Sequence, residues 1–218
     1  MREIPKILED IREGIINILL PKTCVACGKE GKYICEKCSL FLSEAPTVFM
    51  AGGLEELVSA WEYEGVIRDV IFKIKYDGMF DVIDELVGKA FEIREPYVPE
   101  DTIITFVPMF KKKEKRRGFN QAELIAKKVG EITGREVFPL IEKIKDTPSQ
   151  TELDKEERLI NVKDSFALFR PGLNKSLAEN VLLIDDVWTS GATMGECCKI
   201  LKKSGVKKVW GFTLARTV

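Results

Sequence analysis

The sequence contains no histidine among its 218 residues. Histidine is the side chain whose ordinary pKa lies near neutral pH, and it is also the commonest protein ligand for transition metals. Its absence means that a general base in this chain must be a carboxylate, a tyrosine, a lysine or the substrate itself. For the same reason, a metal site must be built from cysteine sulfur or from oxygen ligands.

The sequence also lacks a hydrophobic run that is both long and free of charge. Charged residues make up 32% of the chain, and no apolar stretch reaches the length needed to cross a bilayer. Residues 1–20 carry several charges, including Arg2 and Glu3, where a signal peptide would have an uninterrupted apolar segment. Their apolar positions recur at helical spacing, which predicts an amphipathic helix. We therefore expect a cytoplasmic protein with no membrane span.

An excess of positive charge is missing as well. The chain has 34 lysines and arginines against 35 aspartates and glutamates, so its formal net charge is −1. This balance argues against a globally cationic nucleic-acid binder, although it allows a local basic patch. With 45% hydrophobic residues, the composition is that of a globular protein with room for one full domain and a small appendage.

Four of the six cysteines form two C-x-x-C pairs separated by seven residues: Cys24 with Cys27, and Cys35 with Cys38. Two such pairs can enclose one tetrahedral ion, which favours a structural zinc with four sulfur ligands and no open position for catalysis. The alternatives are disulfides, which a reducing cytosol disfavours, and an iron–sulfur cluster, which usually has other spacings. We expect residues 1–45 to form an N-terminal helix and zinc knuckle, and residues 46–218 to form the main domain.

Strand-like and helix-like patterns alternate along the rest of the chain. The strand-like segments are residues 54–63, 102–107, 136–140, 165–169, 181–184 and 208–214, and the helix-like segments are residues 66–74, 82–90 and 122–132. This alternation predicts an α/β fold in which helices flank an open parallel sheet.

The most informative segment is residues 181–193. Four apolar residues lead into Asp185 and Asp186, and a loop of hydroxyl-bearing and small residues follows before a helical pattern begins. Acids at the end of a parallel strand lie where open α/β sheets bind ligands. The loop would wrap its N–H groups around an anion at the start of the next helix. The loop residues are Thr189, Ser190, Gly191, Ala192 and Thr193.

Two acids that touched a phosphate would repel it, so they fit the hydroxyls of a polyol such as ribose, or a divalent metal. The alternative is an ordinary core strand that ends in a solvated Asp-Asp turn. In the helix that follows, Cys197 and Cys198 point in different directions and make a poor chelate, so we expect both to be buried by packing.

A basic run follows the strand predicted at residues 102–107. Six of the seven residues at positions 111–117 are lysine or arginine. Because this run lies at the same edge of the sheet as the phosphate loop, it predicts a diphosphate site that uses Lys111, Arg116 and Arg117. The alternatives are a solvated face and contacts with nucleic-acid phosphates. Lys73 and Lys75 could also approach a phosphate, but lysines on a helix are more often solvated.

A polar insertion occupies residues 143–164, between the strands predicted at 136–140 and 165–169. Insertions of this length inside a compact domain are usually functional. We interpret the insertion as a flap that closes over the substrate and excludes water from a reactive sugar cation.

The residues at 181–193 resemble the 5-phosphoribosyl 1-diphosphate (PRPP) signature of type I phosphoribosyltransferases. Several further segments extend the similarity over nearly the whole chain to the ComF family, which includes GntX-type proteins. They are the cysteine knuckle, Lys75–Gly78, Arg117–Ala122, Gln150–Asn161 and Thr213–Arg216. The resemblance implies a type I phosphoribosyltransferase fold with an added zinc knuckle.

The same resemblance implies roles for individual residues. Asp185 and Asp186 would contact the ribose hydroxyls of PRPP, residues 189–193 would bind its 5-phosphate, and Mg²⁺ would accompany the ligand. Some members of the family are linked to DNA uptake during competence.

Two kinds of function remain open at this stage. One is a phosphoribosyltransferase that uses PRPP and Mg²⁺. The other is a non-catalytic sensor of PRPP or nucleotides, or a DNA-processing partner whose basic run meets single-stranded DNA or the uptake machinery. The sequence identifies neither an acceptor site nor a catalytic base.

Overall fold

The computed structural model describes residues 21–147, 162–169 and 178–217. The chain divides into two compact units, residues 1–42 and 43–218. The helix predicted for residues 1–20 and the central part of the predicted flap, residues 148–161, lie outside the described residues. Among the residues that are described, no helix is long and apolar enough to cross a membrane.

The smaller unit contains a tight turn and one short helix, α2 (Glu36–Ser39). A single bridge joins Thr23 to Glu30, and the amide of Gly28 donates a hydrogen bond of 2.8 Å to the carbonyl of Cys24. Gly28 has a φ of +74°, which a glycine adopts without strain. The turn therefore closes directly on the first pair of cysteines.

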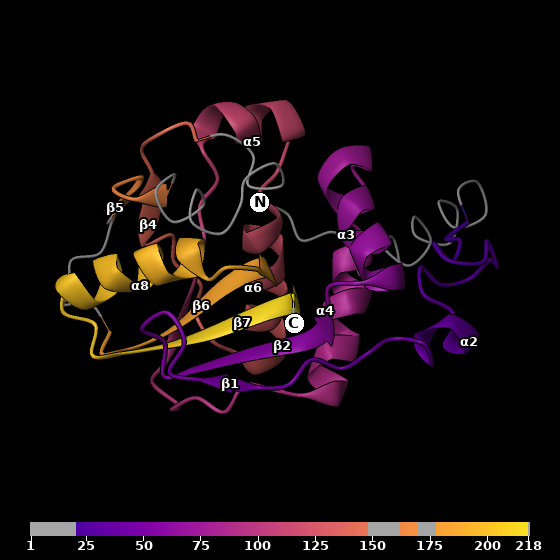
Figure 1. Ribbon diagram of the computed structural model, residues 1–218, viewed down its shortest axis with the longest axis horizontal. Coiled ribbons are helices and arrows are strands. Elements are labelled where there is room, and N and C mark those ends of the chain that lie inside the picture. Colours follow the sequence, from indigo (N-terminus) through magenta and orange to yellow (C-terminus); the bar gives the residue numbers. More distant parts are fainter. Residues whose placement is uncertain (1–20, 148–161, 170–177, 218) are drawn as a thin grey trace, which may run out of the picture. The chain divides into compact units, whose positions relative to one another are not determined.

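The larger unit is built around a five-stranded sheet with the order β1-β2-β7-β6-β3 (Figure 1). The strands are β1 (Val48–Phe49), β2 (Glu56–Glu62), β3 (Ile103–Phe106), β6 (Asn180–Trp188) and β7 (Lys208–Arg216). The short edge strand β1 is antiparallel to β2, and all other neighbours are parallel. The predicted α/β class is confirmed, with a sheet that is mixed only at this edge.

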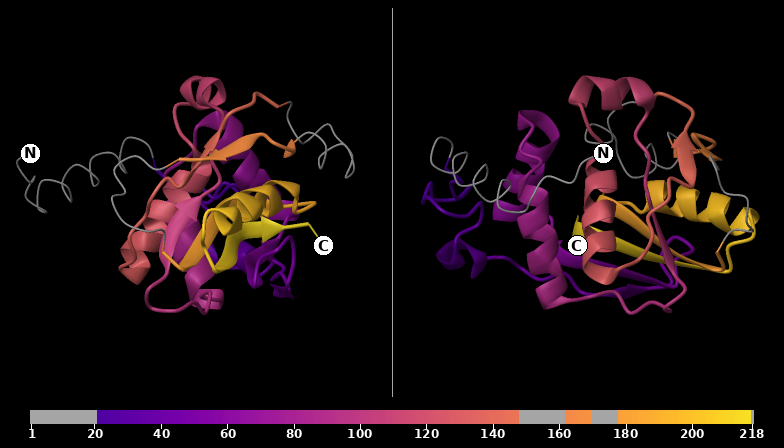
Figure 2. Two further views of the ribbon diagram at one scale, coloured as in Figure 1. Left: turned by 90° about the vertical axis from the view of Figure 1, so that its left-hand side faces the viewer. Right: turned by 180° about the vertical axis from the view of Figure 1, so that it is seen from behind.

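Helices cover both faces of the sheet. Helices α4 and α6 pack on one face, and α8 packs on the other (Figures 1 and 2). The helices are α3 (Gly65–Asp77), α4 (Val82–Ile93), α5 (Lys111–Arg117), α6 (Gln121–Thr133) and α8 (Ala192–Lys203). The helical patterns predicted at residues 66–74, 82–90 and 122–132 correspond to α3, α4 and α6.

Strand β6 is buried on both faces, which explains its continuous apolar sequence. Val181 and Leu183 belong to the core cluster that includes the buried face of α8. Cys197 and Cys198 lie in this cluster with exposures of 0% and 1%, so their predicted burial is confirmed. The core thus fixes the end of β6 against the start of α8.

Three segments differ from the sequence expectation. Residues 136–140 form only a single bridge, between Val137 and Ile104, because Pro139 has no N–H to continue the pairing. The strand predicted at 165–169 is β5 (Phe166–Leu168), but it pairs with β4 (Ile141–Lys143) in a separate two-stranded sheet. The basic run, for which no helix was predicted, forms α5.

Candidate ligand-binding cleft and cysteine metal site

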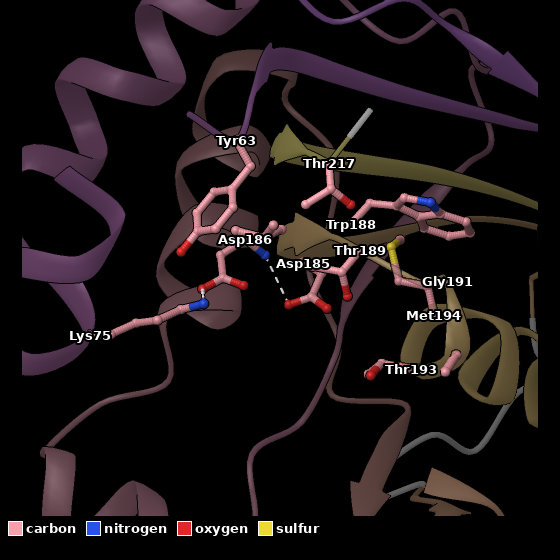
Figure 3. A pocket seen from close by; sticks show the side chains of 12 residues that line it. Tyr63, Lys75, Asp185, Asp186, Trp188, Thr189, Gly191, Thr193, Met194 and Thr217 are labelled. Atoms are coloured by element: carbon pink, nitrogen blue, oxygen red, sulfur yellow. Dashed lines mark hydrogen bonds and ion pairs between the residues drawn. The ribbon is translucent and has the colours of Figure 1, made fainter. Parts of the chain in front are cut away.

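The acids and the loop of the signature lie around one cavity, called here the acid-pair cavity (Figure 3). Its volume is about 300 Å³. It is lined by Asp185, Asp186, Thr189, Gly191, Ala192 and Thr193, together with Tyr63, Lys75, Val187, Trp188, Met194 and Thr217. Ser190 is the predicted loop residue that does not line it, and the Ser190 hydroxyl instead accepts a hydrogen bond of 3.4 Å from the amide of Ala192.

The loop has its shape because Gly191 lies against an indole ring. Gly191 is the N-cap of α8 and has a φ of +76°. A Cβ atom added at this position would lie 2.4 Å from Cζ2 of Trp188, far inside van der Waals contact. Only glycine tolerates both the positive φ and the close approach of the indole ring. The loop can therefore fold back from the end of β6, and the first turn of α8 lines the cavity.

The two acids are in different electrostatic states. Burial and the neighbouring charge of Asp186 raise the pKa of Asp185 to about 8, so Asp185 is mostly protonated at neutral pH. Asp186 is buried, and its Oδ2 lies 2.7 Å from Nζ of Lys75. Burial is the largest single effect and acts to lower the pKa of Lys75, but the charge of Asp186, its hydrogen bond and the charge of Asp185 together outweigh burial, so the pKa is raised. Asp185 therefore contributes little negative charge to the acid pair at neutral pH, and Asp186 faces one ammonium.

A second cavity, the central cavity, continues from the first. It has a volume of about 380 Å³ and shares Tyr63, Lys75, Asp185 and Thr193 with the acid-pair cavity. Its wall adds three cationic side chains, Lys113, Arg117 and Lys143. Burial and the charge of Lys113 lower the pKa of Lys143. This part of the cleft has positive potential and suits an anion.

The cations of α5 point in different directions. Arg117 and Lys113 line the central cavity, whereas Arg116 lines an adjoining space, the basic cavity, of about 450 Å³. Lys111 lines neither space and instead borders cavities on the other side of α5 with Glu114. Three residues were predicted to bind diphosphate. Of these, Arg117 lines the central cavity together with Asp185, Arg116 lines the adjoining basic cavity, and Lys111 lines neither.

The four cysteines of the smaller unit converge. Their sulfur atoms all lie within 4.8 Å of one another, and the distance from Sγ of Cys27 to Sγ of Cys35 is 3.7 Å. A tetrahedral zinc with bonds of about 2.3 Å separates its sulfurs by about 3.8 Å, whereas a disulfide would bring them to about 2 Å. The cysteines are free thiols. The cluster therefore fits a four-sulfur zinc knuckle.

No model of a known protein family matches the chain. The chain is 27% identical to Competence protein F of Haemophilus influenzae over 88% of its length and 84% of the relative. It is 28% identical to Competence protein ComFC of Streptococcus pneumoniae, over 89% of this chain and 81% of the relative. Identity to the DNA utilization protein YhgH of Salmonella typhi is 25%, over 89% and 84% of the two chains. The chain is thus similar over most of its length to Competence protein F and ComFC, which supports the predicted resemblance to the ComF family.

The Arg-Gly-Phe-Asn-Gln block, residues 117–121, has a clear structural role. Gly118 ends α5 in the left-handed conformation, and Asn120 begins α6 by accepting a hydrogen bond of 3.1 Å from the amide of Ala122. The side-chain amide of Asn120 also donates to the carbonyl of Val107 at 3.1 Å. The block therefore fixes the segment after β3 and, through a 2.7 Å hydrogen bond from Arg117 to Gln121, the cationic wall of the cleft.

The sequence pattern assigns the wrong environment to one residue of this cleft. It favours a solvated Lys75, and the structure corrects this, because the Lys75 side chain is 22% exposed and contacts Asp186. Lys73 is the solvated lysine of the pair and contacts only the exposed Asp77 among the described carboxylates, at 3.6 Å. A signal was available: Lys75 lies four residues after the buried Ile71, so it continues the buried stripe of α3.

Proposed function

We propose that this protein binds PRPP in the cleft formed by the acid-pair and central cavities. The observation that carries the proposal is the arrangement of three chemically different walls along one continuous space. A loop at a helix N-terminus suits a monophosphate, the adjacent carboxyls suit sugar hydroxyls, and the cationic wall suits a diphosphate. PRPP has these three groups in the same order.

The 5-phosphate lies against residues 189–193, of which Thr189, Gly191, Ala192 and Thr193 line the acid-pair cavity. The ribose 2- and 3-hydroxyls meet Asp185 and Asp186. The diphosphate enters the central cavity beside Arg117 and Lys113, with Lys143 behind it. Arg116 is the next cation along the cleft.

Magnesium fits this cleft as a partner of the ligand. Mg²⁺ takes oxygen ligands and is commonly held by substrate phosphates together with one or two carboxylates. Asp186 already pairs with Lys75, and Asp185 favours its protonated form, so the acid pair alone offers little charge to a free ion. When bound, the metal supplies charge neutralisation at the diphosphate.

The chemistry supported by this cleft is group transfer at the anomeric carbon. The bond from C1 of the ribose to the diphosphate oxygen breaks, and an acceptor atom bonds to C1. Positive charge develops on the ribosyl group as negative charge grows on the leaving diphosphate. Asp186 stabilises the positive charge on the ribosyl group, and Arg117 and Lys113 stabilise the negative charge on the diphosphate. No covalent intermediate on the protein is needed.

Calorimetric titration of PRPP in the presence of Mg²⁺ tests the proposal. The double variant Asp185→Asn, Asp186→Asn should lose PRPP binding and keep its fold, because it removes the ribose contacts without changing side-chain size. A matched double variant, Asp69→Asn with Asp84→Asn, changes two exposed carboxylates on α3 and α4 and should bind as the wild type does. Unchanged affinity in the first variant would contradict the ribose assignment.

The alternative function for the same ligand is that of a sensor, which binds PRPP without catalysing its reaction. It is separated from an enzyme by assaying diphosphate release with pooled nucleobases and amines as acceptors. Binding heat with release supports a phosphoribosyltransferase, and binding heat without release supports a sensor.

A second candidate function is contact with single-stranded DNA, as part of DNA uptake or use. The relatives are named for competence and DNA utilization. The observation that favours it is a row of exposed aromatic rings beside the basic helix. Phe72, Tyr76 and Phe80 are 54–55% exposed, and the guanidinium carbon of Arg117 lies 5.8 Å from the centre of the Tyr76 ring. Aromatic rings with adjacent cations are the usual platform for single strands.

Gel shifts of a single-stranded oligonucleotide at two salt concentrations test this second function. Binding should weaken at the higher salt because counterions compete for the phosphates. Tyr76→Ala combined with Arg116→Gln should weaken it further, whereas Tyr97→Ala, which removes a 91% exposed ring elsewhere, should not. The absence of a shift at low salt would exclude this function.

We also propose that the four cysteines bind one structural zinc. All four positions are filled by sulfur, which leaves no open coordination site for catalysis.

A further inference from the structure

Lys75 stands where three spaces of the cleft meet. Its side chain lines the acid-pair cavity, the central cavity and the basic cavity. Figure 3 shows the side chain entering from α3, on the far side of Asp186 from the loop at residues 189–193. An ammonium in this place borders both the sugar end and the diphosphate end of the proposed ligand.

The contact with Asp186 does not exhaust the hydrogen-bonding capacity of Lys75. An ammonium has three N–H donors and no acceptor. Among the described residues, Asp186 is the carboxylate within ion-pair distance, through the single oxygen Oδ2 at 2.7 Å. The Lys75 side chain remains 22% exposed toward the cleft. Donors are therefore left for a second acceptor that enters the cleft.

We propose that Lys75 is a positioning residue that bridges Asp186 to the diphosphate of the ligand. This inference rests on the proposed binding of PRPP. One N–H of the ammonium holds the Asp186 carboxylate toward the ribose diol, and another donates to a diphosphate oxygen in the central cavity. The ribosyl group and its leaving group are thereby held at a fixed separation by one side chain.

A purely structural role is the competing explanation. In that case Lys75 would only tie the end of α3 to the end of β6, and its loss would disturb every ligand that needs Asp186. If Lys75 has the bridging role, its loss should weaken mainly the binding of ligands that carry a diphosphate, because only these ligands accept the second hydrogen bond. Ribose 5-phosphate keeps the monophosphate and the diol but lacks the diphosphate, so it separates the two explanations.

The chain contains a matched control on the same helix. Lys73 is two residues earlier on α3, pairs with the exposed Asp77 and lines none of the three cavities. Lys73→Gln removes the same charge from the same helix without touching the cleft. Lys75→Gln replaces the bridging ammonium with a polar group, and Lys75→Met replaces it with an apolar group. The test needs only one of these two variants to fold. Lys75→Arg keeps the charge.

The experiment is calorimetric titration of each variant with PRPP and with ribose 5-phosphate at one fixed Mg²⁺ concentration. Ribose 5-phosphate is measured by displacement of PRPP where its own heat is small. Lys75→Gln and Lys75→Met should weaken PRPP at least about tenfold, as expected for loss of a charge-assisted hydrogen bond. Their affinity for ribose 5-phosphate should change less than about threefold. Lys75→Arg should recover part of the PRPP affinity, and Lys73→Gln should match the wild type.

Two results would overturn the inference while leaving PRPP binding intact. One is an unchanged PRPP affinity in the neutral variants. The other is an equal loss for both ligands in a variant whose circular dichroism and melting temperature are those of the wild type, which would mean a structural role alone. Failure of the wild-type chain to bind PRPP is a different result, which overturns the proposed function and this inference with it.

Discussion

The backbone N–H of Asp186 donates a hydrogen bond of 2.9 Å to the side-chain Oδ1 of Asp185. This contact turns the Asp185 carboxyl back toward its own backbone, while Asp186 reaches the ammonium of Lys75. Neighbouring residues of one strand thus enter the same cavity with different partners. Burial and the charge of Asp186 raise the pKa of Asp185, and this shift has measurable consequences.

The contribution of Asp185 to stability should fall as pH rises between about 4 and 8. The pKa of Asp185 is raised from its ordinary value of 3.8 to about 8, first by burial and then by the charge of Asp186. In that window the folded protein holds a proton that the unfolded chain has lost, so the free energy of unfolding decreases with pH and levels off above 8. Urea denaturation across this range measures the slope.

The variant Asp185→Asn should flatten that slope, because the amide has no proton to lose. Asp69→Asn, a change at an exposed position on α3, should leave the slope as it is. A slope that survives Asp185→Asn would assign the titration to another group.

Gly191→Ala should damage both the fold and the ligand site. The new Cβ would meet the indole of Trp188 at 2.4 Å in a backbone conformation with positive φ. We expect a loss of about 3 kcal/mol or more in unfolding free energy and a large loss of PRPP affinity. Gly134→Ala has nearly the same φ but open space around its Cβ, so it should lower stability by only about 1 kcal/mol.

Comparing the two alanine variants isolates the effect of the Trp188 contact from that of the backbone conformation. Equal losses of stability would show that the close approach between the loop and the indole is unimportant. The measurement is thermal or urea unfolding, followed by PRPP titration of the folded fraction.

Inorganic diphosphate should distinguish the cations of α5. Arg117→Gln should weaken diphosphate binding about tenfold, since Arg117 lines the central cavity beside the acid pair. Lys111→Gln removes the same charge from the same helix but from a side chain that faces away, and it should change affinity less than about twofold. Similar losses in both variants would mean that only the net charge of the helix matters.

One zinc per chain should be found by metal analysis, and a strong chelator should unfold the smaller unit alone. All three tryptophans, at positions 61, 188 and 210, belong to the larger unit, so their fluorescence should remain native while zinc is released. Cys27→Ser should abolish stoichiometric zinc binding. Cys198→Ser changes a buried thiol outside the cluster and should retain one zinc.

The sequence predicted those features that depend on local patterns. Apolar residues at helical spacing gave α3, α4 and α6, and the continuous apolar run of β6 indicated a strand buried on both faces. The order of acids, loop and helix start was sufficient to place Asp185, Asp186 and the loop around one cavity. The spacing of the four cysteines indicated a convergent cluster for the same reason, since chain connectivity alone keeps each pair together.

Other features depend on which side chains meet across the fold, and no local pattern contains that information. The sequence alone determined helices α3, α4 and α6, strand β6, the acid pair with its phosphate-type loop, and the cysteine pairs, because each arises from residues close together in the chain. Only the tertiary structure decided that Lys75 of α3 reaches Asp186 of β6, that Lys111 turns away while Lys113 and Arg117 face the cleft, and that Asp185 favours its protonated form. Those outcomes follow from packing between distant segments, which sets the burial and the distances on which charge interactions depend.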